Sequence, residues 1–124
     1  MTKPALGSIL LGTTNPHRLR DWYAAALAPD DSGEAFTEVT PTMFAGTFGD
    51  TSVLIDGRSD VADKNPDPGR VILNFHVDDA RATADHLNTL GVTWLVDLEE
   101  RAGGIFGTLV DPDGNYVQII ELKE

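Results

Sequence analysis

The sequence predicts an α+β domain made of two copies of one β-α-β-β-β module, and three observations lead to this fold class. An apolar run, Leu6–Thr13, is followed by Asn15-Pro16 and a helical pattern. The same order returns around Asp79, about 64 residues after Asn15. A Gly-Asp or Gly-Asn pair, at 49–50 and 114–115, then precedes the last extended stretch of each copy. Repetition of this kind indicates that each copy is one supersecondary unit.

The first module is expected to span residues 1–56. Asn15 is a preferred N-cap residue, and Pro16 suits the first position of a helix. The spacing of apolar residues then predicts a helix over His17–Leu27. Three short strands are expected after it, at Ala35–Thr40, Met43–Phe48 and Thr51–Asp56.

The second module is expected to span residues 70–124, after a polar linker at 57–69 that is rich in turn-forming residues. Apolar residues alternate from Arg70 to Val77, which predicts a strand. Asp79 caps the helix that follows, and Gly91 ends it. The apolar stripe of this helix consists of Ala80, Ala84, Leu87 and Leu90. Three further strands are expected at Val92–Leu98, Ile105–Val110 and Tyr116–Leu122.

Composition limits the possible classes of function. With 124 residues and 41% hydrophobic content, the chain is expected to form one domain. It has no cysteine, which excludes thiol catalysis, thiolate metal sites and disulfides. A formal net charge of −11 disfavours nucleic-acid partners and favours cationic ones, or serves solubility alone. The apolar run Leu6–Gly12 is too short for a signal segment or a membrane span, so a cytoplasmic protein is expected.

Three segments resemble a known family. Residues 111–122, Asp-Pro-Asp-Gly-Asn-Tyr-Val-Gln-Ile-Ile-Glu-Leu, resemble the closing turn and strand of the vicinal-oxygen-chelate superfamily. Residues 75–79, Phe-His-Val-Asp-Asp, resemble its strand-to-helix junction in the second module, and Trp22-Tyr23 with Leu27 resembles its first helix. The superfamily includes glyoxalase I, extradiol dioxygenases, fosfomycin-resistance enzymes and bleomycin-resistance proteins. The resemblance implies two curled sheets that enclose an open cup, with a helix behind each sheet, and a homodimer.

The resemblance also implies where a metal would bind. In the metal-dependent members, ligands come from the first and last strands of the modules. Counting from the helix caps and the Gly-Asp or Gly-Asn pairs assigns these positions to Ser8, Ile72, Val53 and Gln118. A divalent ion needs several histidine or carboxylate ligands, and none of these residues supplies one. We therefore expect no metal and no other cofactor.

Period-2 alternation predicts which strand residues face the cup. Apolar walls with a few polar groups are typical of a small-molecule pocket. His76 is the candidate for a general acid or base, since histidine is the side-chain type that can exchange a proton near neutral pH, unless it only hydrogen-bonds a carbonyl or carboxylate near Asp78 or Asp79. Trp94 either stacks on a flat ligand or belongs to the core. The ligand-binding candidates are Ser8, Leu10, Ile72, Asn74, His76, Tyr116, Gln118 and Trp94.

Three functions remain open. The first is a metal-free protein that binds or sequesters a small organic molecule, which is expected to be cationic or aromatic. The non-ligating positions favour it, and the acidic charge favours it for a cationic ligand. The second is a glyoxalase-like lyase or isomerase, or a dioxygenase-type enzyme, that acts on a vicinal-oxygen substrate. The third is an accessory domain whose cup serves as a dimer interface. Whether any catalysis occurs is left open by the residues themselves.

Overall fold

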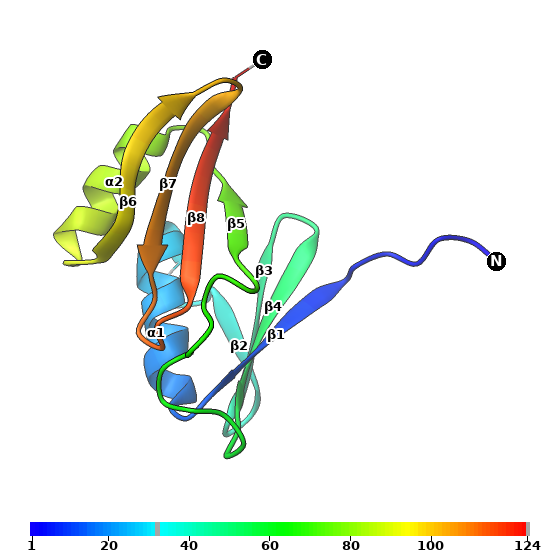
Figure 1. The fold of residues 1–124 in the computed structure, drawn as a ribbon. Helices are drawn as coiled ribbons and strands as arrows, with labels where there is room; N and C mark the ends of the chain where they lie inside the picture. The colour runs from blue at the N-terminus through cyan, green and yellow to red at the C-terminus, as the bar shows by residue number, and fades with distance from the viewer. Residues whose placement is uncertain (32, 124) are drawn as a thin grey trace. The chain divides into compact units, whose positions relative to one another are not determined.

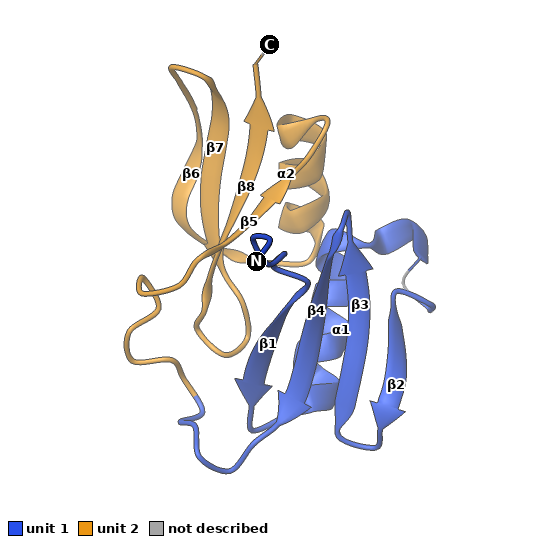
Figure 2. Cartoon of the chain, turned by 90° about the vertical axis from the view of Figure 1, so that its right-hand side faces the viewer, with its two compact units in different colours: residues 1–63 blue, residues 64–124 orange. Residues whose placement is uncertain are grey.

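The structure, a computed structural model, describes residues 1–31 and 33–123 of the chain. It divides into two compact units, Met1–Asp63 and Lys64–Glu124 (Figure 2). Each unit has one α-helix and one four-stranded mixed sheet within the described residues, so the predicted α+β fold of two similar modules is confirmed. The division between the units falls inside the segment 57–69 that was expected to link them.

The first unit follows the order β-α-β-β-β, with a short 3-10 helix after the α-helix (Figure 1). Its strands are arranged β1-β4-β3-β2, with β1 parallel to β4 and the other pairs antiparallel. The elements are β1 (Ser8–Thr13), α1 (Pro16–Leu27), η1 (Pro29–Asp31), β2 (Phe36–Thr40), β3 (Met43–Phe48) and β4 (Thr51–Gly57).

Helix α1 begins as the sequence predicts. The Asn15 side chain accepts a hydrogen bond from the backbone N–H of Arg18 at 3.1 Å, which satisfies one of the donors left free in the first turn. The helix packs on one face of the sheet, because Arg20 and His17 both contact the ring of Phe44 in β3. The core of this unit lies between helix and sheet and includes Leu19, Tyr23, Ala26, Phe44, Val53 and Ile55.

The second unit repeats this arrangement, with strand order β5-β8-β7-β6 and β5 parallel to β8. Asp79 caps its helix by accepting from the backbone N–H of Ala82 at 3.0 Å, and Gly91 follows the helix with a φ of 71°. Its core includes Leu73, Ala84, Leu87, Leu109, Val117 and Ile119. The elements are β5 (Leu73–His76), α2 (Ala80–Thr89), β6 (Thr93–Arg101), β7 (Gly104–Val110) and β8 (Tyr116–Leu122).

Two details of the second unit differ from the prediction. The strand expected over Arg70–Val77 is shorter, because Arg70 donates its backbone N–H to the carbonyl of Asp67 in a turn and the β5–β8 ladder begins only at Leu73. Ile72 therefore lies just outside the ladder and is 40% exposed. Leu90, expected in the buried stripe, is the C-cap residue and is exposed.

The outer strands of both sheets are irregular. The β2–β3 pairing shifts register between Glu38 and Thr40, and the β6–β7 pairing shifts twice between Trp94 and Glu99. Bulges of this kind twist an edge strand and discourage pairing with another chain. Neither α1 nor α2 is long and apolar enough to cross a membrane.

Candidate functional site: the open faces of the two sheets

The second sheet has one face covered by α2 and one face free of it, here called the second open face. The α2 side is identified by Glu121, whose carboxylate accepts from the backbone N–H of Ala80 at 2.9 Å. Side chains alternate between the two faces along each strand. Asn74, His76 and Gln118 alternate with Leu73 and Val117, which are buried on the α2 side, so these three lie on the second open face.

A row of polar side chains crosses the second open face. Asn74 pairs with Gln118 across the parallel β5–β8 ladder, and Gln118 pairs with Thr108 across the antiparallel β7–β8 ladder. Paired residues on one face have Cβ atoms about 4.5–5.5 Å apart. The sequence therefore identified two members of this row, and Thr108 was missed because only the pairing with Gln118 reveals its place.

Less polar positions lie on both sides of this row. His76, Ile120 and Phe106 form the next row, and the pair Tyr116 and Val110 lies on the other side. His76 is exposed, and its side chain makes no hydrogen bond or ion pair with another residue in 1–31 or 33–123, so the contact near Asp78 or Asp79 does not form. The face thus combines amide, hydroxyl and imidazole groups with apolar side chains.

Trp94 lies on the opposite face, which corrects the expectation that it belongs with Asn74 and Gln118. It pairs with Leu109 on the α2 side, and its indole N–H donates to the Asn88 side chain at 2.8 Å. A Cβ on Gly107 would approach the Trp94 ring at 3.1 Å, so the indole lies over a glycine of the same face.

The first sheet likewise has a face opposite α1, here called the first open face. Ser8 and Leu10 lie there and pair with Ser52 and Leu54 of β4. Val53 does not: it is 4% exposed and pairs with Ile9 and Gly46 on the α1 side. Counting from the Gly pair placed Val53 wrongly, because two residues join β3 to β4 whereas five join β7 to β8. Leu54 is the counterpart of Gln118, since Leu10 and Asn74 each stand five residues before a helix cap.

The donor set on these faces does not fit a divalent ion of the kind that the superfamily resemblance implies. Ser8 and Gln118 are weak neutral donors, and Leu54 and Ile72 have no donor atom. In the part of the chain that the structure describes, no group of three or more histidine, aspartate or glutamate side chains is placed to hold a metal ion. The expectation that the protein carries no metal stays a prediction.

The turn before β8 is held by a buried carboxylate. One oxygen of Asp111 accepts from the backbone N–H groups of Asp113 and Asn115 at 2.8 and 3.0 Å, and the other accepts from the Asn115 amide at 2.9 Å. Asn65 donates to the Asn115 side-chain oxygen at 2.9 Å. Gly114 has a φ of 80°, which favours glycine. The turn thereby positions the start of β8 and with it Tyr116 and Gln118.

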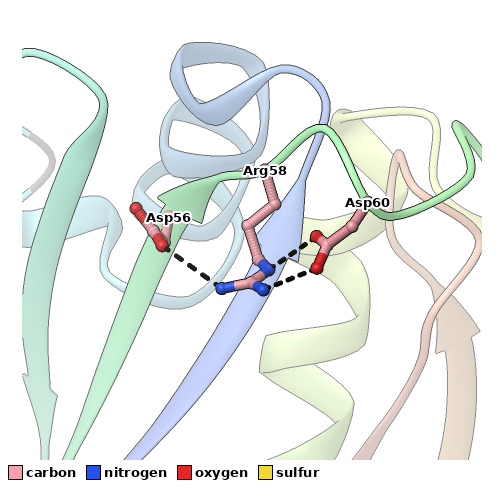
Figure 3. Close-up of polar contacts among 3 residues, drawn as sticks. All are labelled: Asp56, Arg58 and Asp60. Carbon is pink, nitrogen blue, oxygen red and sulfur yellow. Dashed lines mark hydrogen bonds and ion pairs between the residues drawn. The ribbon is translucent and has the colours of Figure 1, made fainter.

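Two further features of the first unit lie outside the residues that the sequence singled out for binding. One is a hollow of about 440 Å³ with two carboxylates, two hydroxyls and an aromatic ring in its lining, formed by Ala28, Asp31, Glu34, Ala35, Thr37, Ala45, Thr47 and Phe48. The other is an ion-pair cluster at the end of β4, formed by Asp56, Arg58 and Asp60 (Figure 3).

In this cluster two guanidinium nitrogens of Arg58 donate hydrogen bonds to the two carboxylate oxygens of Asp60, at 2.8 and 2.7 Å. Hydrogen bonding and charge from Arg58 lower the pKa of the Asp60 carboxyl, and the same hydrogen bond raises the pKa of Arg58. Asp56 is 4.0 Å from the third nitrogen, at the limit of an ion pair. No sequence pattern predicts that these three residues lie together. Asp56 was expected only as the last residue of a strand.

Solved structures show the same fold at low sequence identity. A virulence protein from Salmonella typhimurium has a TM-score of 0.76 at 18% identity, with 99% of this chain and 100% of that chain covered. TnmS3, an antibiotic binding protein from Streptomyces sp. CB03234, has a TM-score of 0.74 at 19% identity, with 99% of both chains covered. A glyoxylase/bleomycin resistance protein/dioxygenase domain from Frankia sp. EAN1pec has a TM-score of 0.76 at 15% identity, with 98% and 100% covered.

No curated protein sequence matches the chain. The glyoxalase-like domain family, in contrast, matches residues 8–120, which include every strand and helix of both units except the last two residues of β8. The duplicated module and the closing turn at residues 111–115 point to the same family as this match. The chain belongs to the glyoxalase-like domain family, within the vicinal-oxygen-chelate superfamily.

Proposed function

We propose that the chain binds or sequesters a small organic molecule on the second open face, without the divalent metal of its enzymatic relatives. The observation that carries the proposal is the row Asn74, Gln118 and Thr108, which offers two amides and a hydroxyl between less polar positions. Ligand sites of small molecules are mostly apolar with a few polar groups that fix orientation. Neutral donors and acceptors of this kind suit a ligand better than a metal ion.

Two further points support the proposal. One structural neighbour, TnmS3, is an antibiotic binding protein, so a chain of this fold and length serves binding in at least that case. The net charge of −11 speeds the encounter with cations and slows the encounter with anions. The expected ligand is therefore a flat, apolar molecule with a cationic or hydrogen-bond-donating group.

A thermal-shift panel of cationic, neutral and anionic aromatic compounds tests the proposal. A ligand at a hundred times its dissociation constant stabilises the folded state by about 2.7 kcal/mol, which raises the Tm of a domain of this size by several degrees. Thr108→Val removes the hydroxyl at constant shape, and Gln118→Leu removes the amide. Both should reduce the shift, while Thr14→Val, in the exposed bend between β1 and α1, should not.

Two results would contradict the proposal. If no compound shifts the Tm, the chain does not bind this class of molecule. If a bound compound is chemically changed, and His76→Ala abolishes the change, the glyoxalase-like or dioxygenase-type enzyme is the better description. The expected homodimer is tested separately by sedimentation at micromolar concentration, where a clean monomer would exclude it.

A further inference from the structure

The second open face carries an ion pair beside an aromatic ring, next to the hairpin that joins β6 to β7 (Figure 1). Glu99 pairs with Phe106, which belongs to the row beside the polar row. Arg101 stands two residues after Glu99 and pairs with Gly104, two residues before Phe106. Because side chains two residues apart in a strand share a face, Glu99, Phe106 and Arg101 all lie on the face that holds the polar row.

Glu99 holds the guanidinium of Arg101 near the Phe106 ring. The Nε–H of Arg101 donates to one carboxylate oxygen of Glu99 at 2.7 Å, and Nη2 contacts the same oxygen. The Cζ atom of Arg101 lies 5.5 Å from the centre of the Phe106 ring, within the range of a cation–π contact. Both charged side chains are half-exposed, so the pair is accessible to solutes and adds no net charge to the face.

One guanidinium nitrogen of Arg101 has hydrogen-bonding capacity to spare. An arginine side chain offers five N–H donors and no acceptor. Nε and Nη2 contact Glu99, whereas Nη1 makes no hydrogen bond or ion pair with another residue in 1–31 or 33–123. Since the pair is neutral and the chain has a net charge of −11, this donor suits an uncharged acceptor better than an anion.

The distance between this donor and the polar row suits a ligand with hydrogen-bonding groups on opposite edges. Thr108 is four residues from Gly104, the partner of Arg101, and two residues from Phe106, which the guanidinium contacts. At about 3.4 Å per residue, these offsets are about 14 and 7 Å. One aromatic ring with a hydrogen bond of about 3 Å at either edge fills an interval between these limits.

We propose that Arg101 donates a hydrogen bond from Nη1 to a carbonyl oxygen of the ligand. It thereby selects flat molecules that carry an acceptor on the edge opposite to the group bound by Asn74 and Gln118, while Phe106 packs against the ring. A hydrogen bond from a charged donor is stronger than one between neutral groups, so this contact discriminates between ligands with and without the acceptor. The inference rests on the proposed small-molecule binding and adds the acceptor to the chemistry of its ligand.

The test compares acridone with acridine in mildly alkaline buffer, where both compounds are uncharged. Acridone has a carbonyl and an N–H on opposite edges of its central ring, and acridine has the same fused rings without the carbonyl. Titration of the full chain, followed by ligand fluorescence, should show tighter binding of acridone. Arg101→Met keeps an unbranched stem beside Phe106, and it should weaken acridone about tenfold and leave acridine within about twofold.

Arg81→Met is the matched control. Arg81 of α2 pairs with Glu100 of the same strand β6 at 3.4 Å, but on the α2 side of the sheet, and its replacement changes the net charge by the same amount. It should leave both affinities unchanged. A loss of acridone affinity equal to that of Arg101→Met would overturn the inference, in favour of a general charge effect.

Three other outcomes would also overturn the inference. An unchanged acridone affinity in Arg101→Met would do so, and a loss of affinity in Gln118→Leu would then leave the proposed function standing. Equal losses for acridone and acridine in Arg101→Met would show that the arginine stem only packs against the ring. If neither compound binds, the inference is wrong, and the wider panel then decides the proposed function.

Discussion

The indole N–H of Trp94 donates to the side-chain oxygen of Asn88 over 2.8 Å, and this bond joins β6 to the end of α2. It accounts for an aromatic residue that was expected either to stack on a ligand or to belong to the core. Because the indole serves the contact between helix and sheet, the polar row on the opposite face is independent of it. That separation makes the two faces of the second sheet distinguishable by mutation.

Trp94→Phe should lower the free energy of unfolding by about 1 kcal/mol and leave ligand affinity unchanged, because it removes one hydrogen bond on the α2 side. Urea unfolding and the thermal-shift panel measure the two effects. Gln118→Leu is the opposite case, since it should reduce affinity with little change in stability. A loss of affinity in Trp94→Phe would show that the ligand lies on the α2 side of the second sheet and not on the second open face.

Asp111→Ala should destabilise the chain by about 3 kcal/mol, because it removes the acceptor of three hydrogen bonds in a buried turn. Asp67→Ala is the matched control, since Asp67 is exposed and near the same turn, and its effect should stay within about 0.5 kcal/mol. Chemical denaturation compares them. Equal effects of the two substitutions would show that the Asp111 network contributes little.

Gly104→Ala should destabilise by about 2 kcal/mol or more, because the added Cβ would collide with the backbone carbonyl of Glu121 in the neighbouring strand. Backbone atoms in a ladder have no room to move aside. Gly7→Ala introduces the same methyl group where nothing lies within 4 Å, and it should be neutral. A Tm of Gly104→Ala equal to that of Gly7→Ala would contradict the close approach of β7 and β8.

The Asp60 carboxyl should titrate below its ordinary pKa of 3.8, because Arg58 hydrogen-bonds and attracts its charged form. A lowered pKa in the folded state means that the pair stabilises the fold at neutral pH and loses this contribution as pH falls through the lowered value. Carboxyl titration by NMR measures it. Arg58→Met keeps the stem over Gly12 and should return the pKa of Asp60 toward 3.8, and no change would exclude Arg58 as the cause.

The purified chain should carry no stoichiometric divalent metal after dialysis against zinc, nickel or manganese, since the residues at the expected ligand positions are neutral or apolar. Elemental analysis checks this. One firmly held ion per chain would remove the main support for metal-free binding. It would favour a glyoxalase-like or dioxygenase-type enzyme instead.

Local chemistry made much of the fold predictable from sequence. Asn15 and Asp79 cap their helices as expected, because a capping side chain bonds a backbone N–H only three residues away. The strand over 116–122 has the predicted bounds, since the turn at Asp111 and Gly114 defines where it begins. Repetition of these local signals was also enough to indicate the duplicated module and its family.

The sequence by itself therefore determined the order of elements, the helix caps and the face on which Asn74, His76 and Gln118 lie. Only the tertiary structure decided that Leu54 rather than Val53 is the counterpart of Gln118, and that Trp94 turns toward α2. The reason is physical: a side chain changes face with every residue, so one residue more in a hairpin turn or a bulge inverts the assignment of a strand.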